Sequence, residues 1–151
     1  MAGSPADARA DCPLCGGEGG VLVARTPRLR VVLAEDPDYP AYVRVIWNAH
    51  VAEMSDLGAA ERAVLLAAVH AAETALREIV APHKINLASL GNQVPHVHWH
   101  VVARFRYDAH LPQPIWGSRQ REPDPARLRL LREKLPALAL RITDLLAAPP
   151  D

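Results

Sequence analysis

Three histidines alternate with apolar residues in the segment His96-Val97-His98-Trp99-His100-Val101-Val102. Alternate side chains of a strand point to the same face, so this pattern predicts three imidazoles on one face and apolar side chains on the other. Every second residue advances a strand by ~6.6 Å, and neighbouring rings can therefore share one substrate group or one metal ion. A lone histidine in a strand is usually structural and a His-x-His pair is often half of a metal site, which makes metal binding the main alternative to catalysis.

The middle histidine, His98, is the natural centre for nucleophilic chemistry. Neutral imidazole is a nucleophile at physiological pH, and a ring that donates one N–H to a carbonyl keeps the lone pair of its other nitrogen. Attack on phosphorus would give a phosphoramidate that water can displace, and the oxygens that gain charge need donors nearby. Candidate donors in the sequence are His100, Asn86, Asn92 and Gln93.

A second group of candidate ligands lies in Cys12-Pro13-Leu14-Cys15. This spacing lets two thiolates bind one zinc ion, but it supplies only half of a tetrahedral site. The chain has 2 cysteines, and a structural disulfide is disfavoured in a reducing compartment. From the spacing alone, a zinc site, a redox pair and two unreactive thiols all remain open.

The histidine segment resembles the signature of the histidine triad (HIT) family, His-φ-His-φ-His-φ-φ with φ apolar, and fits it at every position. Residues 45–50 are similar to the family's strand that ends in a histidine, and Lys84-Ile85-Asn86 to its strand that ends in a substrate-facing asparagine. The resemblance extends from Cys12 to Trp116. It implies a nucleotide hydrolase or nucleotidyl transferase that cleaves at an α-phosphate through a nucleotidyl-histidine intermediate.

The resemblance also implies roles for single residues. His98 matches the nucleophile, His100 a phosphate contact that assists protonation, and Asn86 a residue near the ribose or the phosphate. The loop after Asn86 is one residue shorter than in familiar members, which leaves the separate roles of its polar residues open. The family's base pocket corresponds to residues 32–39. The implied site has His98 and His100 as catalytic residues and Asn86, Asn92, Gln93 and His100 as substrate-binding residues.

HIT relatives that carry the CxxC pair complete a zinc site with two histidines. The implied ligands of a structural Zn²⁺ are Cys12, Cys15, His50 and His96. Such a closed site would hold the N-terminal segment, the end of one strand and the catalytic strand together. If no metal binds, His96 becomes a polar partner within the triad.

The elements that must position these residues follow from the apolar pattern. Between residues 59 and 80, apolar side chains recur every three or four positions and predict one long helix. Short apolar runs predict strands at residues 21–23, 29–33, 42–47, 84–90 and 96–105, of which the last two should pair as a hairpin. The predicted fold class is α+β, an HIT-like antiparallel sheet of about five strands with helices on one side.

The end of the chain predicts a C-terminal helical extension over residues 124–151. Asp124-Pro125 has the form of an N-cap followed by proline at the first helical position, and Pro136 is expected to end this first helix. Residues 137–148 form either a second helix or a short strand, and residues 149–151 are expected to fray.

Composition limits the class of protein. The 151 residues, 50% of them hydrophobic, suit a single domain over residues 1–151. Because 17 basic residues balance 17 acidic ones, we expect no nucleic-acid partner, although a small anionic ligand is permitted. Residues 1–7 lack a signal-like pattern and no apolar run could cross a bilayer, so a cytoplasmic protein without membrane association is expected. The resemblance further implies a homodimer.

The roles of the residues that follow the histidine segment have two interpretations each. Trp116 could cover a nucleotide site, although such a tryptophan is more often a core or dimer-interface anchor. Four arginines are expected to form a solvated charged face, with contact to a polyphosphate as the alternative: Arg104, Arg106, Arg119 and Arg121.

The leading functional prediction is an HIT-type hydrolase that acts on a dinucleoside polyphosphate or a nucleoside phosphoramidate and releases a nucleoside monophosphate. One alternative is a nucleotidyl transferase, in which a second phosphate or a sugar phosphate replaces water. Another is a noncatalytic module that binds zinc or a nucleotide. The substrate itself, including its base, does not follow from the sequence.

Overall fold

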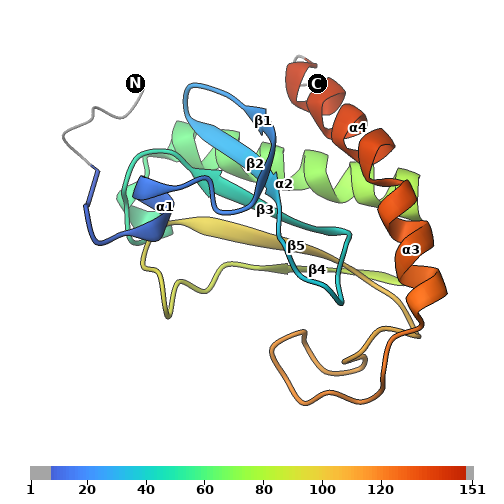
Figure 1. Cartoon of the computed structure of the whole chain (residues 1–151). Coiled ribbons are helices and arrows are strands. Elements are labelled where there is room, and N and C mark those ends of the chain that lie inside the picture. Colours follow the sequence, from blue (N-terminus) through green and yellow to red (C-terminus); the bar gives the residue numbers. More distant parts are fainter. Residues whose placement is uncertain (1–7, 149–151) are drawn as a thin grey trace.

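Five antiparallel strands form one sheet in the order β1-β2-β3-β5-β4 (Figure 1). The computed structural model describes residues 8–148, so the predictions for residues 1–7 and 149–151 lie outside the described residues. The strands are β1 (Val21–Arg25), β2 (Leu29–Leu33), β3 (Tyr42–Trp47), β4 (Lys84–Ala88) and β5 (His98–Arg104). The predicted α+β class is confirmed, and β4 and β5 form the expected antiparallel pair.

The long helix α2 (Ala59–Val80) has the predicted bounds. Its N-terminus is closed by Glu61, whose carboxylate accepts a hydrogen bond from the Gly58 N–H at 2.8 Å, as in a capping box. It ends at Val80, and the next residue, Ala81, adopts a left-handed conformation before Pro82. The buried side chains of α2 are spaced three and four residues apart and pack on β3 and β5, which is the amphipathic pattern that the sequence predicts.

Two helices follow the sheet, α3 (Pro125–Glu133) and α4 (Leu135–Ala147). The Asp124 carboxylate caps α3 by accepting a hydrogen bond from the Ala126 N–H at 2.9 Å. Pro136 does not simply end α3 but lies in the first turn of α4, where a missing N–H leaves no helical hydrogen bond unmade. The tail is therefore a helix and not a strand. No described helix is both long and apolar enough to cross a membrane.

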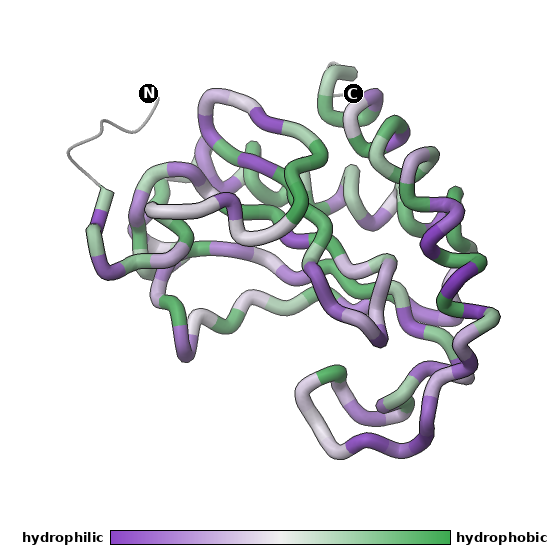
Figure 2. The backbone as a smooth tube through the Cα atoms, viewed as in Figure 1, coloured by the Kyte–Doolittle hydropathy of each residue, from purple (hydrophilic) through white to green (hydrophobic). Residues whose placement is uncertain are grey.

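The two faces of the sheet differ in chemistry. One face carries the main apolar core against α2 and α4, as predicted. The other face carries the polar residues of the candidate site and is partly covered by the one-turn helix α1 (Pro13–Gly16), which lies on the near side of the sheet in Figure 1. Figure 2 shows that the long connection between β5 and α3, below the sheet in this view, is mostly hydrophilic.

The prediction for the strand at residues 96–105 is wrong at its start. β5 begins at His98, and β4 ends at Ala88, two residues before its predicted end. His96 lies in a bend after Pro95, where its N–H bonds to the carbonyl of Val94 at 2.8 Å. The three imidazoles therefore do not form one row on a strand, because the first of them precedes it.

Candidate functional site

His98 opens β5 and lines a cavity of about 670 Å³ on the polar face of the sheet. Its Nδ1 lies 2.6 Å from the carbonyl oxygen of His96, so Nδ1 is the donor and Nε2 keeps its lone pair. Burial lowers the pKa of His98, which favours the neutral ring. These are the orientation and protonation state that a nucleophilic imidazole requires.

His100 lies two residues further along β5 and is buried. The Tyr42 hydroxyl is 2.5 Å from His100 Nδ1, and burial raises the pKa of that tyrosine, which keeps it a phenol that can donate. A hydrogen bond to Nδ1 places the proton of neutral His100 on Nε2. Burial, followed by the charges of His98 and Arg44, lowers the pKa of His100 to about 4. At neutral pH, His100 is therefore an N–H donor without net charge.

The cavity brings together most of the predicted substrate residues. Asn92 and Gln93, from the loop between β4 and β5, line it together with His98 and His100. The predicted base-pocket range contributes residues 34–36. The polar and charged residues of this cavity are Glu35, Asp36, Tyr42, Arg44, Asn92, Gln93, His98 and His100.

Asn86 lies outside this cavity and lines a neighbouring one of about 390 Å³ along β4. Its Oδ1 accepts a hydrogen bond from Arg104 Nη1 at 2.7 Å, which leaves the amide Nδ2 as the group that can donate to a ligand. Trp116 lines both cavities. The structure therefore places Asn86 in a different cavity from the other predicted site residues, and the two cavities share Trp116.

Trp116 is 51% exposed and lies edge-on to His100, with 4.9 Å between ring centroids. Trp116 is not buried and belongs to none of the described apolar clusters. Its side chain forms part of the cavity wall. Its exposure speaks against a core anchor, and a cover over a ligand site and a dimer-interface anchor both stay predictions.

Arg104 contradicts the predicted solvated face, because its side chain is only 1% exposed. It forms an ion pair with Asp108, at 2.8 Å between Nε and Oδ2 and 3.1 Å between Nη2 and Oδ1. Burial would raise the pKa of Asp108, but hydrogen bonds from Arg104 and from three backbone N–H groups lower it to about 2. Those N–H groups belong to Phe105, His110 and Leu111. One carboxylate thus anchors the loop that carries Trp116.

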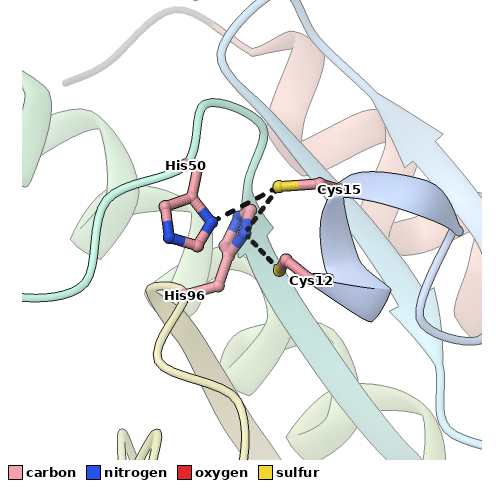
Figure 3. A group of neighbouring side chains, drawn as sticks. All are labelled: Cys12, Cys15, His50 and His96. Atoms are coloured by element: carbon pink, nitrogen blue, oxygen red, sulfur yellow. Dashed lines mark hydrogen bonds between the residues drawn. The ribbon is translucent and has the colours of Figure 1, made fainter. Parts of the chain in front are cut away.

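Four potential metal ligands meet at one end of the sheet (Figure 3). They are Cys12, Cys15, His50 and His96, and their donor atoms all lie within 4.8 Å of one another. Sulfur–nitrogen distances are 3.4 Å from Cys12 to His96, 3.3 Å from Cys15 to His50 and 3.6 Å from Cys15 to His96. Tetrahedral zinc with Zn–S of about 2.3 Å and Zn–N of about 2.1 Å separates such atoms by about 3.6 Å. The donor set therefore fits zinc.

The local structure explains how these ligands converge. Helix α1 begins directly after Cys12, and the N–H of Cys15 bonds to the carbonyl of Cys12 at 3.1 Å, so both sulfurs lie at one helical turn. The Nε2 of His96 donates to the carbonyl oxygen of Trp47 at 2.6 Å, which leaves Nδ1 free as a ligand. The backbone carbonyl of His96 orients His98. His96 thus links the two sites.

Sequence reasoning missed Tyr42 and Arg44, which share a face of β3 and line the cavity. The Arg44 guanidinium lies 5.2 Å from the centre of the Tyr42 ring, and its Nη1 donates to the carbonyl of Gly19 at 2.9 Å. A signal was present, because an arginine interrupts an otherwise apolar central strand between Val43 and Val45. Such a charge in a predicted strand interior is unusual without a partner or a function.

A five-stranded antiparallel sheet with one long helix behind it and paired histidines on its other face defines a protein of the HIT fold class. The HIT domain family model matches residues 19–107. The chain belongs to the HIT family, as the resemblance in its sequence indicated.

Several known proteins are similar to this chain in sequence or structure. A Mycobacterium tuberculosis protein named AP-4-A phosphorylase is 31% identical over 122 residues, covering 77% of this chain and 63% of that protein. The chain thus spans less than two thirds of the length of this relative. A crystal structure of a histidine triad protein from Bradyrhizobium japonicum matches with 31% identity and a TM-score of 0.63, covering 78% of this chain and 91% of that one. One from Sinorhizobium meliloti matches with 27% identity and a TM-score of 0.65, covering 83% and 88%.

Proposed function

We propose that this protein is a nucleotide hydrolase that cleaves at an α-phosphate and releases a nucleoside monophosphate. The observation that carries the proposal is the hydrogen bond of 2.6 Å between His98 Nδ1 and the His96 carbonyl, on a ring that lines a cavity large enough for a nucleotide. It leaves Nε2 as the nucleophilic atom. The substrate class is a dinucleoside polyphosphate or a nucleoside phosphoramidate.

In the proposed reaction, His98 Nε2 attacks the α-phosphorus, a P–N bond forms and the bond to the leaving group breaks. His100 Nε2–H donates to a phosphate oxygen and assists protonation of the leaving group. The amides of Asn92 and Gln93 provide further donors, and Asn86 contacts the substrate from the neighbouring cavity. Water then displaces His98 and regenerates the free imidazole.

Nucleotidyl transfer is the second candidate, and the name of the Mycobacterium tuberculosis relative supports it. AP-4-A phosphorylase is 31% identical to this chain, and its name describes cleavage by phosphate. In that reaction inorganic phosphate attacks the same nucleotidyl-histidine in place of water. Both candidates use His98 in the same way and differ only in the acceptor.

Products from diadenosine tetraphosphate separate the two candidates. Hydrolysis gives AMP and ATP, whereas phosphorolysis gives ADP and ATP and needs added phosphate. Assays with and without phosphate, together with adenosine phosphoramidates and a nucleoside diphosphate sugar, cover the proposed substrate class. We expect AMP release independent of phosphate, and ADP release only with phosphate would favour the transferase.

The variant His98→Ala tests the nucleophile. We expect it to fold and to lose turnover by about 10³-fold or more, because the proposed nucleophilic nitrogen is removed. His70→Ala is the matched control, since His70 is exposed on α2. Near-normal turnover by His98→Ala would refute the mechanism, and no turnover by the wild type on any substrate would favour a noncatalytic binding module.

Zinc bound by Cys12, Cys15, His50 and His96 is the proposed cofactor. A zinc ion with four protein ligands has no open position, so it would supply structure and not catalysis. Its effect would be to hold α1, the end of β3 and the start of β5 together, and with them the His96 carbonyl that orients His98.

A further inference from the structure

The cavity that contains His98 also contains a guanidinium that the proposed mechanism does not use. Arg44 lies in the middle of β3, directly opposite His100 in the β3–β5 register, and lines the same cavity. Its charge acts on His100, because it is one of the causes that lower the pKa of that histidine. A fixed positive charge therefore lies beside the place where the proposed phosphate would bind.

The hydrogen bonds of Arg44 are incomplete. Nη1 donates to the Gly19 carbonyl, whereas Nε is buried and has no partner within residues 8–148. Arg44 also takes part in no ion pair among these residues. A half-buried charge without a counterion is costly, and such local conflicts concentrate at functional sites.

Other buried arginines of this protein are satisfied by the fold itself. Arg30 donates to the carbonyls of Leu14, Gly17 and Glu18. Arg104 has a complete ion pair and two further acceptors. Arg44 differs from both, which indicates that its counterion comes from a ligand.

Neither acidic residue of the cavity forms an ion pair with Arg44 within residues 8–148. Asp36 is engaged with the backbone, since its Oδ1 accepts a hydrogen bond from the Asp38 N–H at 3.0 Å. Glu35 is exposed on the same loop. The cavity thus has carboxylates on the loop after β2 and a cation beside the histidines, which suits a ligand with hydroxyls at one end and an anion at the other.

We propose that the Arg44 guanidinium binds a non-bridging oxygen of the substrate's α-phosphate, between His100 and the backbone of Gly19. This inference rests on the proposed function and adds a substrate-binding residue to it. The planar guanidinium supplies charge-assisted hydrogen bonds that lysine matches only in part. Arg44 and His100 then approach the phosphate from neighbouring strands.

Equilibrium binding of AMP and adenosine, measured by calorimetry, tests this inference without turnover. We expect Arg44→Gln to bind AMP about 10- to 100-fold more weakly than the wild type, as for loss of a charged hydrogen bond, and to bind adenosine unchanged. Glutamine keeps a donor for the Gly19 carbonyl, and Arg44→Lys should recover part of the AMP affinity. Arg129→Gln, at an exposed position of α3, is the control.

Two results would overturn the inference: AMP affinity within twofold of the wild type in Arg44→Gln, or an equal loss of AMP and adenosine affinity. Pyrophosphate binding and wild-type turnover separate its failure from that of the proposed function. If the wild type turns over substrate and Arg44→Gln binds AMP as the wild type does, only the role of Arg44 is refuted. Absent turnover with pyrophosphate binding that depends on Arg44 refutes the enzyme and retains the anion site.

Discussion

The Tyr42 hydroxyl controls which nitrogen of His100 carries the proton, and it does so through a single hydrogen bond to Nδ1. Without the phenol, neutral His100 can place its proton on either nitrogen, and only the Nε2–H form can donate to the substrate as proposed. Position, not charge, is the contribution of this residue. Tyr42 is therefore a positioning residue and not a catalytic one.

We expect Tyr42→Phe to lower kcat by about tenfold, the scale of one lost hydrogen bond, with a smaller change in KM. Tyr107→Phe is the control, because Tyr107 is also partly buried but packs against Phe105 and Arg127, away from the cavity. Steady-state kinetics of both variants measures the effect. Equal kinetics of Tyr42→Phe and the wild type would show that His100 does not need this donor.

His100 also makes stability depend on pH. Its pKa is lowered from 6.5 to about 4 in the folded state, so the unfolded chain binds a proton first as the pH falls. The stability that comes from neutral His100 is fully present above pH 6.5 and is lost between pH 6.5 and about 4. The loss amounts to at most about 3 kcal/mol.

Urea unfolding of the wild type and His100→Gln at several pH values checks this dependence. We expect the free energy of unfolding of the variant to fall less between pH 6.5 and 4, and the two curves to run parallel above pH 6.5. Acid effects on the zinc ligands occur in both proteins and cancel in the difference. Parallel curves over the whole range would contradict the lowered pKa.

At the scale of elements, one buried ion pair organises the connection between β5 and α3. Asp108 receives Arg104 and three backbone N–H groups, and Arg121 donates to its carbonyl at 2.7 Å. Arg104 also donates to the Gln113 carbonyl and to Asn86 Oδ1, so the position of the loop that carries Trp116 and the orientation of Asn86 both depend on this arrangement. A break in it should therefore act on stability and on the wall of the cavity together.

Asp108→Asn leaves the Arg104 charge buried without a counterion, which costs about 3–5 kcal/mol. Asp38→Asn is the matched control, because its ion pair with Arg119 is partly exposed and such pairs contribute about 1 kcal/mol or less. The free energy of unfolding in urea gives both values. If the two variants lose equal stability, the buried pair does not anchor the loop.

The proposed zinc site makes a second prediction at this scale. We expect about one zinc ion per chain in protein purified without chelator, and its loss in Cys15→Ser together with a lower Tm, because α1 is then free to leave the sheet. His98→Ala should keep the metal, since His98 is not a ligand. Elemental analysis with thermal unfolding decides: zinc retained by Cys15→Ser would refute the ligand set.

Much of the molecule could be predicted from periodicity. The short apolar run in residues 42–47 and the three-to-four spacing in residues 59–80 predicted elements with the observed bounds, because apolar patterning and backbone geometry act locally. The four candidate zinc ligands came from a resemblance and lie together. A single domain over residues 1–151, a cytoplasmic location and the individual roles of the site residues stay predictions.

The errors share a tertiary cause. The burial of Arg104 depends on Asp108 folding back onto the strand, and charge alone does not show which arginine finds such a partner. His96 lies before the strand because its ring bonds to the Trp47 carbonyl and its own carbonyl bonds to His98. Arg44 was missed because apolar residues on both sides made its strand resemble a core strand. For Arg104 and His96, contacts with distant residues such as Asn86 and Trp47 also overrode the local preference.

At the scale of the whole molecule, β4 is an edge strand with unpaired backbone groups, and Leu87 on it is 44% exposed. Exposed apolar edges favour pairing with a second sheet, which supports the homodimer that the family resemblance implies. We expect sedimentation to give a molecular mass of twice 16.5 kDa for the wild type. The control Leu140→Glu, at a position on α4 where the leucine is 69% exposed, should give the same mass. Leu87→Glu should sediment as a monomer, because a charge cannot be buried there without a partner. A dimer that survives Leu87→Glu, or a monomeric wild type, would exclude β4 as the interface. The cavity that contains Asn86 runs along this same edge, so loss of the dimer should also change KM.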